Sequence, residues 1–308
     1  MSKGLIKIAQ VFYKLVLFIL LRQKKPEKQL PIAFSLTVHK GSRLLDRIVR
    51  AIYVPDNVYC IHIDKNSSEV FRKAIQAIIR CLPNVFIAAN SVDVHWGHIT
   101  VVQAQFSCME ELLKSKVKWK YYINLVGQDF PLYDNKQVVK ALQALNNTNN
   151  IESFPMPKSQ SYRNKFVFIL KKRRMYNTKK PKGPPPHNIS IYKGSTHIIA
   201  IRQFVEFVLH GQIGKDFYEF LKDTRTPDET TFSSYKDIHE FQAESTEINQ
   251  HGYHGPCIGL VRKTVAFVVG NGCECYVGLP SKIYAGCWEK KRKTTFFFIR
   301  SRLSLTRN

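Results

Sequence analysis

Apolar runs alternate with stretches of helical spacing in the part of the chain that follows Pro31. Residues 32–39 (IAFSLTVH) form a short apolar run that is typical of a buried strand. Apolar residues then recur at helical spacing over 44–52, and residues 58–64 (VYCIHID) form a second strand-like run. This order predicts two parallel strands joined by a helical crossover.

The same alternation continues as far as residue 127. The further elements that it predicts are helices over 70–81 and 100–113 and strands over 84–89 and 121–127. We therefore expect an α/β fold, a layered domain around a mainly parallel sheet. Ligands of such sheets bind beyond the carboxyl ends of the strands, so His39, Asp64 and Asp129 are candidates for one shared crevice.

The second half of the chain is less regular. Its predicted elements are a helix over 136–145, an exposed basic and proline-rich loop over 171–186, a strand over 191–201 and an amphipathic helix over 203–221. Beyond Ser233 the pattern weakens into polar, then glycine-rich, then basic and aromatic sequence. The chain divides into an N-terminal segment (1–30), one large domain (31–285) and a basic tail (286–308).

Residues 5–21 (LIKIAQVFYKLVLFILL) are bracketed by Lys and Arg and followed by no small-residue cleavage site. This pattern predicts an uncleaved signal anchor, near the lower limit of the roughly 17–25 residues that span a bilayer. Lys7 and Lys14 interrupt the stretch, and Lys14 is the harder one to place in a membrane. An amphipathic helix that lies at an interface or packs on the protein is the alternative.

Composition narrows the class of protein. A chain of 308 residues with 44% hydrophobic residues can bury a large core, so disorder is not the default expectation. The formal net charge of +24 favours acidic partners, such as anionic lipid or a phosphorylated small molecule. The sequence has no recognisable nucleic-acid-binding module, so we expect no nucleic-acid partner. A basic membrane-surface protein without catalytic activity is an alternative interpretation.

Seven cysteines and three glycosylation sequons fit the secretory pathway. The sequon asparagines are Asn66, Asn146 and Asn188. The C-terminal group Cys273, Cys275 and Cys287 lacks the spacing and the histidines of a zinc site, so we predict no metal there.

Several long motifs resemble the core-2 and I-branching β1,6-N-acetylglucosaminyltransferases. They are residues 31–67 (PIAFSLTVHKGSRLLDRIVRAIYVPDNVYCIHIDKNS), 120–132 (KYYINLVGQDFPL), 184–209 (PPPHNISIYKGSTHIIAIRQFVEFVL) and 224–229 (TRTPDE). The resemblance covers about two thirds of the chain and implies a glycosyltransferase-A-like fold, anchored in the Golgi membrane with the catalytic domain in the lumen. It also implies inverting transfer of GlcNAc from UDP-GlcNAc, in β1,6 linkage, to Gal or GalNAc of O-glycans or polylactosamine.

The resemblance assigns Glu229 as the catalytic base. Inversion by one in-line displacement needs a single carboxylate to take the proton of the attacking hydroxyl. Pro227 and the acidic pair that follows also fit a helix start whose carboxylates complement the helix dipole.

The leaving diphosphate needs its charge neutralised, and many transferases of this fold use a metal held by Asp-x-Asp. Neither Asp64 nor Asp129 belongs to such a motif. The resembling family is metal-independent and uses an Arg and a Lys, which match Arg262 and, more loosely, Lys282. We therefore expect neither metal nor cofactor. An ordinary surface role is the alternative for each of these cations.

The remaining site residues also come from the resemblance. It assigns the uridine and ribose contacts to Val38, His39 and Asp64. It assigns the donor-sugar contact to Asp129 and the acceptor contacts to Glu152 and Arg163. A strand-terminal Asp64, a hydrogen-bonded loop residue at His39 and a turn-forming Asp129 are the structural alternatives. The resemblance further pairs Cys60 with Cys108.

One interval departs from the family pattern. Residues 233–256 are shorter than the corresponding family segment and lack its Trp-x-Tyr sequence, which lines the acceptor site. Loss of an apolar ring face weakens or redirects acceptor binding. A catalytically weak or inactive family member that binds nucleotide sugar or glycan is therefore the alternative to an active enzyme.

Overall fold

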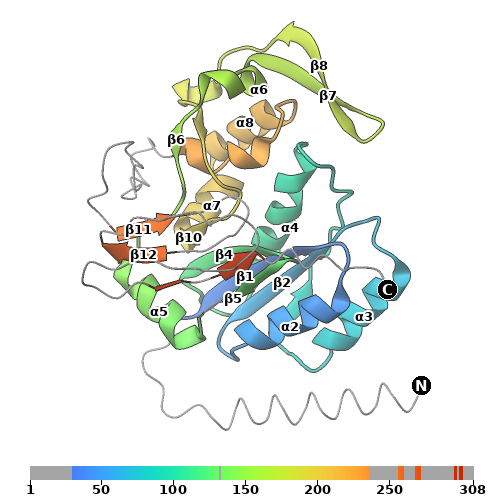
Figure 1. Ribbon diagram of the computed structural model, residues 1–308, viewed down its shortest axis with the longest axis vertical. Helices are drawn as coiled ribbons and strands as arrows, with labels where there is room; N and C mark the ends of the chain where they lie inside the picture. The colour runs from blue at the N-terminus through green and yellow to red at the C-terminus, as the bar shows by residue number, and fades with distance from the viewer. Residues whose placement is uncertain are drawn as a thin grey trace, which may run out of the picture.

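A five-stranded sheet lies at the centre of the molecule (Figure 1). The computed structural model describes residues 30–131 and 133–235 with their side chains, and beyond them only the backbone of four short strands. The strand order is β10-β4-β1-β2-β3, and every neighbouring pair is parallel except β10 with β4. This arrangement confirms the predicted α/β fold with a mainly parallel sheet.

The elements have the following bounds. The sheet strands are β1 (Ile32–Val38), β2 (Val58–Ile63), β3 (Val85–Ile87), β4 (Tyr121–Val126) and β10 (Ile199–Ile201). The helices are α2 (Ser42–Ile52), α3 (Glu69–Ile79), α4 (Thr100–Lys114), α5 (Asn135–Ala144), α6 (Tyr162–Lys165), α7 (Arg202–His210) and α8 (Gln212–Leu221). The shorter strands are β5 (Asp129–Pro131), β6 (Phe154–Pro155), β7 (Phe166–Lys171), β8 (Arg174–Pro181), β9 (Tyr192–Lys193), β11 (Pro256–Gly259), β12 (Val268–Asn271), β13 (Thr295–Phe296) and β14 (Phe298–Arg300).

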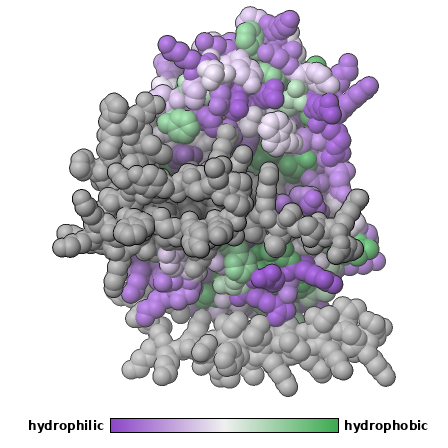
Figure 2. All heavy atoms as spheres, viewed as in Figure 1, coloured by the Kyte–Doolittle hydropathy of each residue, from purple (hydrophilic) through white to green (hydrophobic). Residues whose placement is uncertain are grey.

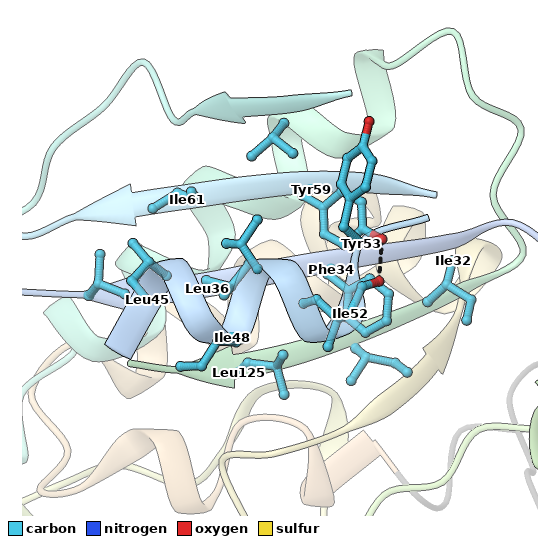
Figure 3. Close-up of a cluster of buried hydrophobic side chains, with 14 of the residues drawn as sticks. Ile32, Phe34, Leu36, Leu45, Ile48, Ile52, Tyr53, Tyr59, Ile61 and Leu125 are labelled. Carbon is cyan, nitrogen blue, oxygen red and sulfur yellow. Dashed lines mark hydrogen bonds between the residues drawn. The ribbon is translucent and has the colours of Figure 1, made fainter. Parts of the chain in front are cut away.

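Two hydrophobic clusters cover the two faces of the sheet. Side chains alternate along β1, so Phe34 and Leu36 face the cluster formed with α2, α3 and α5, while Ala33 faces the cluster formed with α4, α7 and α8. In the first cluster the Phe34 and Tyr59 rings stack with centroids 5.3 Å apart. The Tyr59 hydroxyl donates to the Ile52 carbonyl at 2.6 Å, which satisfies a polar group inside that core (Figure 3).

Local sequence explains where the helices begin and end. Ser68 caps α3 by accepting from the Phe71 N–H at 3.2 Å. Asp134 and Gln137 form a reciprocal capping box at the start of α5. The elements predicted between residues 32 and 145 all exist, within a few residues of their expected bounds.

Three predictions for the second half were wrong in detail. Residues 171–186 are exposed as expected, but they contribute to a β-hairpin, β7 with β8, in place of a loop. The single strand expected over 191–201 is two strands in different sheets, because the Asn124 side chain binds the backbone of Thr196 and Ile198 between them. The single helix expected over 203–221 is broken at Gly211, where a Cβ would lie 2.6 Å from the Phe207 carbonyl oxygen.

The predicted signal anchor over 5–21 and the basic tail over 286–308 lie outside the residues whose side chains are described. Within the described part of the chain, no helix has both the length and the apolar character needed to cross a bilayer.

Candidate active site

The carboxyl ends of β1, β2 and β4 meet at one edge of the sheet. The Asp64 N–H donates to the Val38 carbonyl at 2.9 Å, and the Gly127 N–H donates to the Thr37 carbonyl at 3.1 Å. The structure therefore brings Val38, Asp64 and the turn that precedes Asp129 to a common edge, as the sheet topology predicted. His39 follows Val38 directly and is exposed; its carbonyl accepts from the Ser67 hydroxyl at 3.1 Å.

Asp64 is buried and both of its carboxylate oxygens accept backbone hydrogen bonds. Oδ1 accepts from the Asn66 N–H at 2.7 Å and Oδ2 from the Val94 N–H at 3.0 Å. These contacts fasten the end of β2 to the loop that follows β3. Asp64 thus terminates its strand, as the structural alternative predicted, and it lies at the sheet edge where ligands of parallel sheets generally bind.

Asp129 is 1% exposed and closes the turn after β4. Its Oδ2 accepts from the Val126 N–H at 2.7 Å and lies 3.1 Å from His197 Nε2. Its Oδ1 is buried and has no hydrogen-bond partner among the described residues. Sequence reasoning missed His197, which lies 68 positions away in the chain and gives no local signal. An unpartnered buried carboxylate oxygen beside a histidine can accept a hydroxyl donor of a bound sugar.

Glu229 lies at the end of a single 3₁₀ turn, Pro227–Glu229. Its Oε2 accepts from Arg163 Nη1 at 2.8 Å and from Lys193 Nζ at 2.7 Å. The side chain therefore contacts two cations from other segments. These contacts are not explained by the alternative in which Glu229 only complements a helix dipole. Charge-assisted hydrogen bonds of this kind hold a carboxylate in its ionised form. Lys193 was not predicted as a site residue.

The backbone around Glu229 is held by distant segments. Thr226 adopts a left-handed conformation, with φ 55°, immediately before the turn. Its N–H donates to the Gly97 carbonyl at 2.8 Å, and the Glu229 carbonyl accepts from the Gly194 N–H at 2.8 Å. A β-branched residue with positive φ is strained, so these contacts compensate for its cost.

Two connecting segments join the three acidic positions. Residues 94–97 bind Asp64 at one end, through the Val94 N–H, and Thr226 at the other, through the Gly97 carbonyl. Residues 194–197 bind the Glu229 carbonyl at one end and Asp129 at the other. Glu229, Asp64 and Asp129 therefore belong to one hydrogen-bonded assembly at the edge of the sheet.

Asp228, the residue before Glu229, has a perturbed pKa. Burial, followed by the charge of Glu229, raises the pKa of Asp228 from its ordinary 3.8 to about 6. The charges of Lys193 and Arg163 oppose this rise. Its Oδ1 is buried and has no hydrogen-bond partner in the described part of the chain.

Of the two predicted acceptor residues, one contacts Glu229 and the other lies beside Gly194. Arg163, at the second position of α6, contacts it directly. Glu152 precedes β6, which pairs with β9, and the backbone of Glu152 passes so close to Gly194 that a Cβ there would lie 1.8 Å from the Glu152 carbonyl oxygen. Gln160, at the end of the short 3₁₀ turn before α6, has a buried Oε1 with no partner among the described residues.

Other predicted residues are placed as follows. Arg262 and Lys282 lie outside the described residues. Cys60 and Cys108 are both buried and lie in contact, but the structure has no disulfide bond between them, so the expected pairing stays a prediction. Burial, followed by contact with Cys60, raises the pKa of the Cys108 thiol. The sequon residues Asn66, Asn146 and Asn188 are all exposed. No cluster of three or more His, Cys, Asp or Glu side chains suited to a metal ion occurs among the described residues.

Comparison with known proteins agrees with this architecture. The Core-2/I-Branching enzyme family model matches residues 32–253. A human relative, beta-1,3-galactosyl-O-glycosyl-glycoprotein beta-1,6-N-acetylglucosaminyltransferase 3, is 35% identical in an alignment 279 residues long, which covers 83% of this chain and 64% of that protein. A zebrafish (Danio rerio) relative, beta-1,3-galactosyl-O-glycosyl-glycoprotein beta-1,6-N-acetylglucosaminyltransferase 4, is 44% identical over 214 residues. The alignment covers 68% of this chain and 50% of that protein.

A related protein of bovine herpesvirus 4, with the same transferase name, is 41% identical over 212 residues, 69% of this chain and 48% of that protein. The fold and the acidic edge define an α/β domain with a mainly parallel sheet. The family-model match and the sequence relatives show that the chain belongs to the Core-2/I-branching enzyme family. It spans about half to two thirds of the length of these curated relatives.

Proposed function

We propose that this protein is an inverting β1,6-N-acetylglucosaminyltransferase, with UDP-GlcNAc as donor and Gal or GalNAc of an O-glycan or polylactosamine as acceptor. The observation that carries the proposal is the Glu229 carboxylate, bound to Arg163 and Lys193 and tied through two backbone segments to Asp64 and Asp129. The names of the family members support the reaction type.

In this mechanism Glu229 accepts the proton of the acceptor 6-hydroxyl while that oxygen attacks the anomeric carbon of GlcNAc. The bond from the anomeric carbon to the diphosphate breaks on the opposite face, so the configuration inverts and UDP leaves. Arg163, which already contacts Glu229, also serves the acceptor. Glu152 is the second acceptor residue of this proposal.

The donor side of the proposal uses the sheet edge. Val38, His39 and Asp64 take the uridine and ribose, and Asp129 accepts from a hydroxyl of the GlcNAc. Arg262 and Lys282 neutralise the leaving diphosphate without a metal ion, because guanidinium and ammonium donors stabilise the developing charge.

The cellular setting belongs to the same proposal. Residues 5–21 anchor the protein in the Golgi membrane as a single-pass type II protein, and the domain from residue 31 onward faces the lumen. The exposed sequon asparagines are glycosylated there, and Cys60 and Cys108 form a disulfide.

The decisive experiment measures donor binding and transfer with the same preparations of the purified full chain. UDP binding is titrated calorimetrically in EDTA, and transfer from UDP-GlcNAc to a β1,3-galactosyl O-glycan is followed by mass spectrometry. We expect Glu229→Gln to retain UDP binding and lose transfer, because the amide keeps the shape and loses the basicity. Arg262→Ala is expected to lose UDP binding. Unchanged transfer by Glu229→Gln would remove Glu229 from its role.

A member without turnover is the second candidate, because residues 233–256 lack the Trp-x-Tyr sequence that lines the acceptor site in the family pattern. This candidate predicts UDP or glycan affinity in the wild-type chain without any transfer product. Absence of both UDP binding and glycan binding by the folded protein would reject both candidates.

A further inference from the structure

The β7–β8 hairpin lies in a long stretch without acidic residues. Between Ser153 and Val205 the chain has twelve Lys or Arg residues and no Asp or Glu. The hairpin and its flanks carry most of these cations: Lys165, Lys171, Lys172, Arg173, Arg174, Lys179, Lys180 and Lys182. In the orientation of Figure 1 the hairpin projects at the top of the molecule, and Figure 2 shows hydrophilic side chains over that region.

The register of the hairpin sorts its side chains into two faces. Ile169 pairs with Tyr176, and Lys171 pairs with Arg174. Since side chains two positions apart in a strand share a face, these four lie together. Ile169 and Tyr176 are 49% and 45% exposed, and both cations are exposed as well. The outer face therefore presents an aromatic and apolar centre beside a pair of cations.

The turn of the hairpin adds to this charge. Lys172 and Arg173 are its central residues, with φ of 48° and 62°. Such turns favour Asn-Gly, because residues with a Cβ adopt positive φ at a cost of roughly 1 kcal/mol each. Two cations thus occupy positions that backbone conformation alone would give to other residues.

Most of the hairpin's positive charge is not neutralised by the part of the chain that the structure describes. Arg173 lies 3.3 Å from Asp93, and Lys182 is paired with Asp223. Within the described ranges, no ion pair is formed by Lys171, Lys172, Arg174, Lys179 or Lys180. Exposed like charges attract anions from solution.

The hairpin is fastened next to the site at both ends. At its tip, Arg173 contacts Asp93 in the loop whose Val94 N–H binds Asp64. At its base, β7 begins three residues after Arg163, and the Phe168 N–H donates to the Asp223 carbonyl at 2.8 Å. The hairpin is therefore joined to the segments that carry Arg163 and bind Asp64.

We propose that the outer face of the β7–β8 hairpin binds an anionic glycan, a sialylated or sulfated part of the acceptor chain, and thereby selects acidic acceptors. The Tyr176 ring supplies a flat surface for a pyranose, and Lys171 and Arg174 bind its carboxylate or sulfate. A lipid surface fits less well, because the tip carries charged residues and no apolar side chain for insertion. This inference rests on the proposed function.

Binding, which needs no turnover, tests the inference separately from the reaction. The full chain is titrated with three probes: a sialylated O-glycan, a sulfated oligosaccharide of similar size, and the desialylated form of the first. We expect the two anionic probes to bind more tightly than the neutral one and to lose affinity as salt rises. The Lys171→Gln/Arg174→Gln variant should bind the anionic probes about tenfold more weakly. Because this readout is binding alone, its result stands even if the proposed reaction is wrong.

Lys116→Gln/Lys118→Gln removes the same charge from exposed positions outside the hairpin and is the matched control. Equal weakening by the control would attribute the affinity to net charge and overturn the proposal. Normal binding of the anionic glycans by the hairpin variant would also overturn it. Phosphatidylserine vesicles and single-stranded DNA are titrated in parallel, and a hairpin variant that lost binding only to these two probes would overturn the proposal as well. Unchanged unfolding temperatures establish that both variants are folded. In the transfer assay, the hairpin variant should raise KM for the sialylated acceptor and leave that for the neutral acceptor unchanged.

Discussion

Lys193 Nζ lies 2.7 Å from Oε2 of Glu229, and its side chain is only 7% exposed. Arg163 contacts the same oxygen at 2.8 Å. The pairing depends on β9, because Lys193 lies opposite Phe154 in the β6–β9 pair and its ammonium lies 5.5 Å from the Phe154 ring. A buried lysine without a carboxylate would be costly, so each group stabilises the other's charge.

Replacement of Lys193 by Met should show how much this ion pair contributes to stability and how much it contributes to transfer. We expect the free energy of unfolding of the variant to be about 1–3 kcal/mol lower than that of the wild type. This loss is smaller than for a fully unpaired buried charge, because Arg163 still contacts Glu229. Transfer should fall by roughly tenfold or more, since the carboxylate loses one of its positioning contacts. Chemical denaturation and transfer kinetics measure the two. Lys215→Met, at an exposed position of α8, is the control; a Lys193 variant that matched it would show that the pair has no role.

Asp228 should make stability depend on pH in an unusual direction. Its pKa is about 6 in the folded protein and 3.8 ordinarily, so the folded state holds the proton more tightly. As pH rises from about 4 to 6, the unfolded chain ionises first, and the free energy of unfolding falls by about 1–3 kcal/mol from this group.

Asp228→Asn should therefore be more stable than the wild type at pH 7 and gain nothing at pH 4. Urea denaturation at both values measures this, with the exposed Asp56→Asn as control. A gain of equal size at both pH values would contradict the assignment.

Cys60 and Cys108 come from β2 and α4 and lie together in one core. In protein expressed through the secretory pathway we expect them to form a disulfide, whose reduction lowers the free energy of unfolding by about 2–4 kcal/mol. Alkylation of the denatured, unreduced protein followed by mass spectrometry tests the pairing. The exposed Cys81 serves as the internal comparison for reagent access. Alkylation of both Cys60 and Cys108 under these conditions would show that they are free.

Gly194 permits a close backbone approach that the site needs. A Cβ at this position would lie 1.8 Å from the Glu152 carbonyl oxygen and 2.9 Å from Ser233 Cβ. Gly194→Ala should therefore force the two segments apart, destabilise the fold by about 1–3 kcal/mol and lower transfer. Gly183→Ala is a suitable comparison, because a Cβ there meets nothing within 4 Å. Equal unfolding temperatures for the two variants would refute this requirement.

The sequence by itself determined the α/β framework from residue 32 to residue 145. Apolar runs and helical spacing are local patterns, and a parallel sheet buried on both faces requires them, so Ile32–Val38, Val58–Ile63 and Tyr121–Val126 were foreseeable. The same topology placed Asp64 and Asp129 at one edge. The assignment of Glu229 came from family motifs, because its short local pattern equally suits a helix start.

Tertiary structure decided what the local patterns could not. Residues 171–186 contain basic and proline residues that favour a loop, yet the run before them, Phe166–Lys171, offers a partner strand and part of the segment pairs with it. The break between Tyr192–Lys193 and Ile199–Ile201 comes from Asn124, a side chain distant in sequence. His197 beside Asp129 and Lys193 on Glu229 are likewise contacts between remote segments. Such contacts arise from packing and leave no periodic signal in the chain.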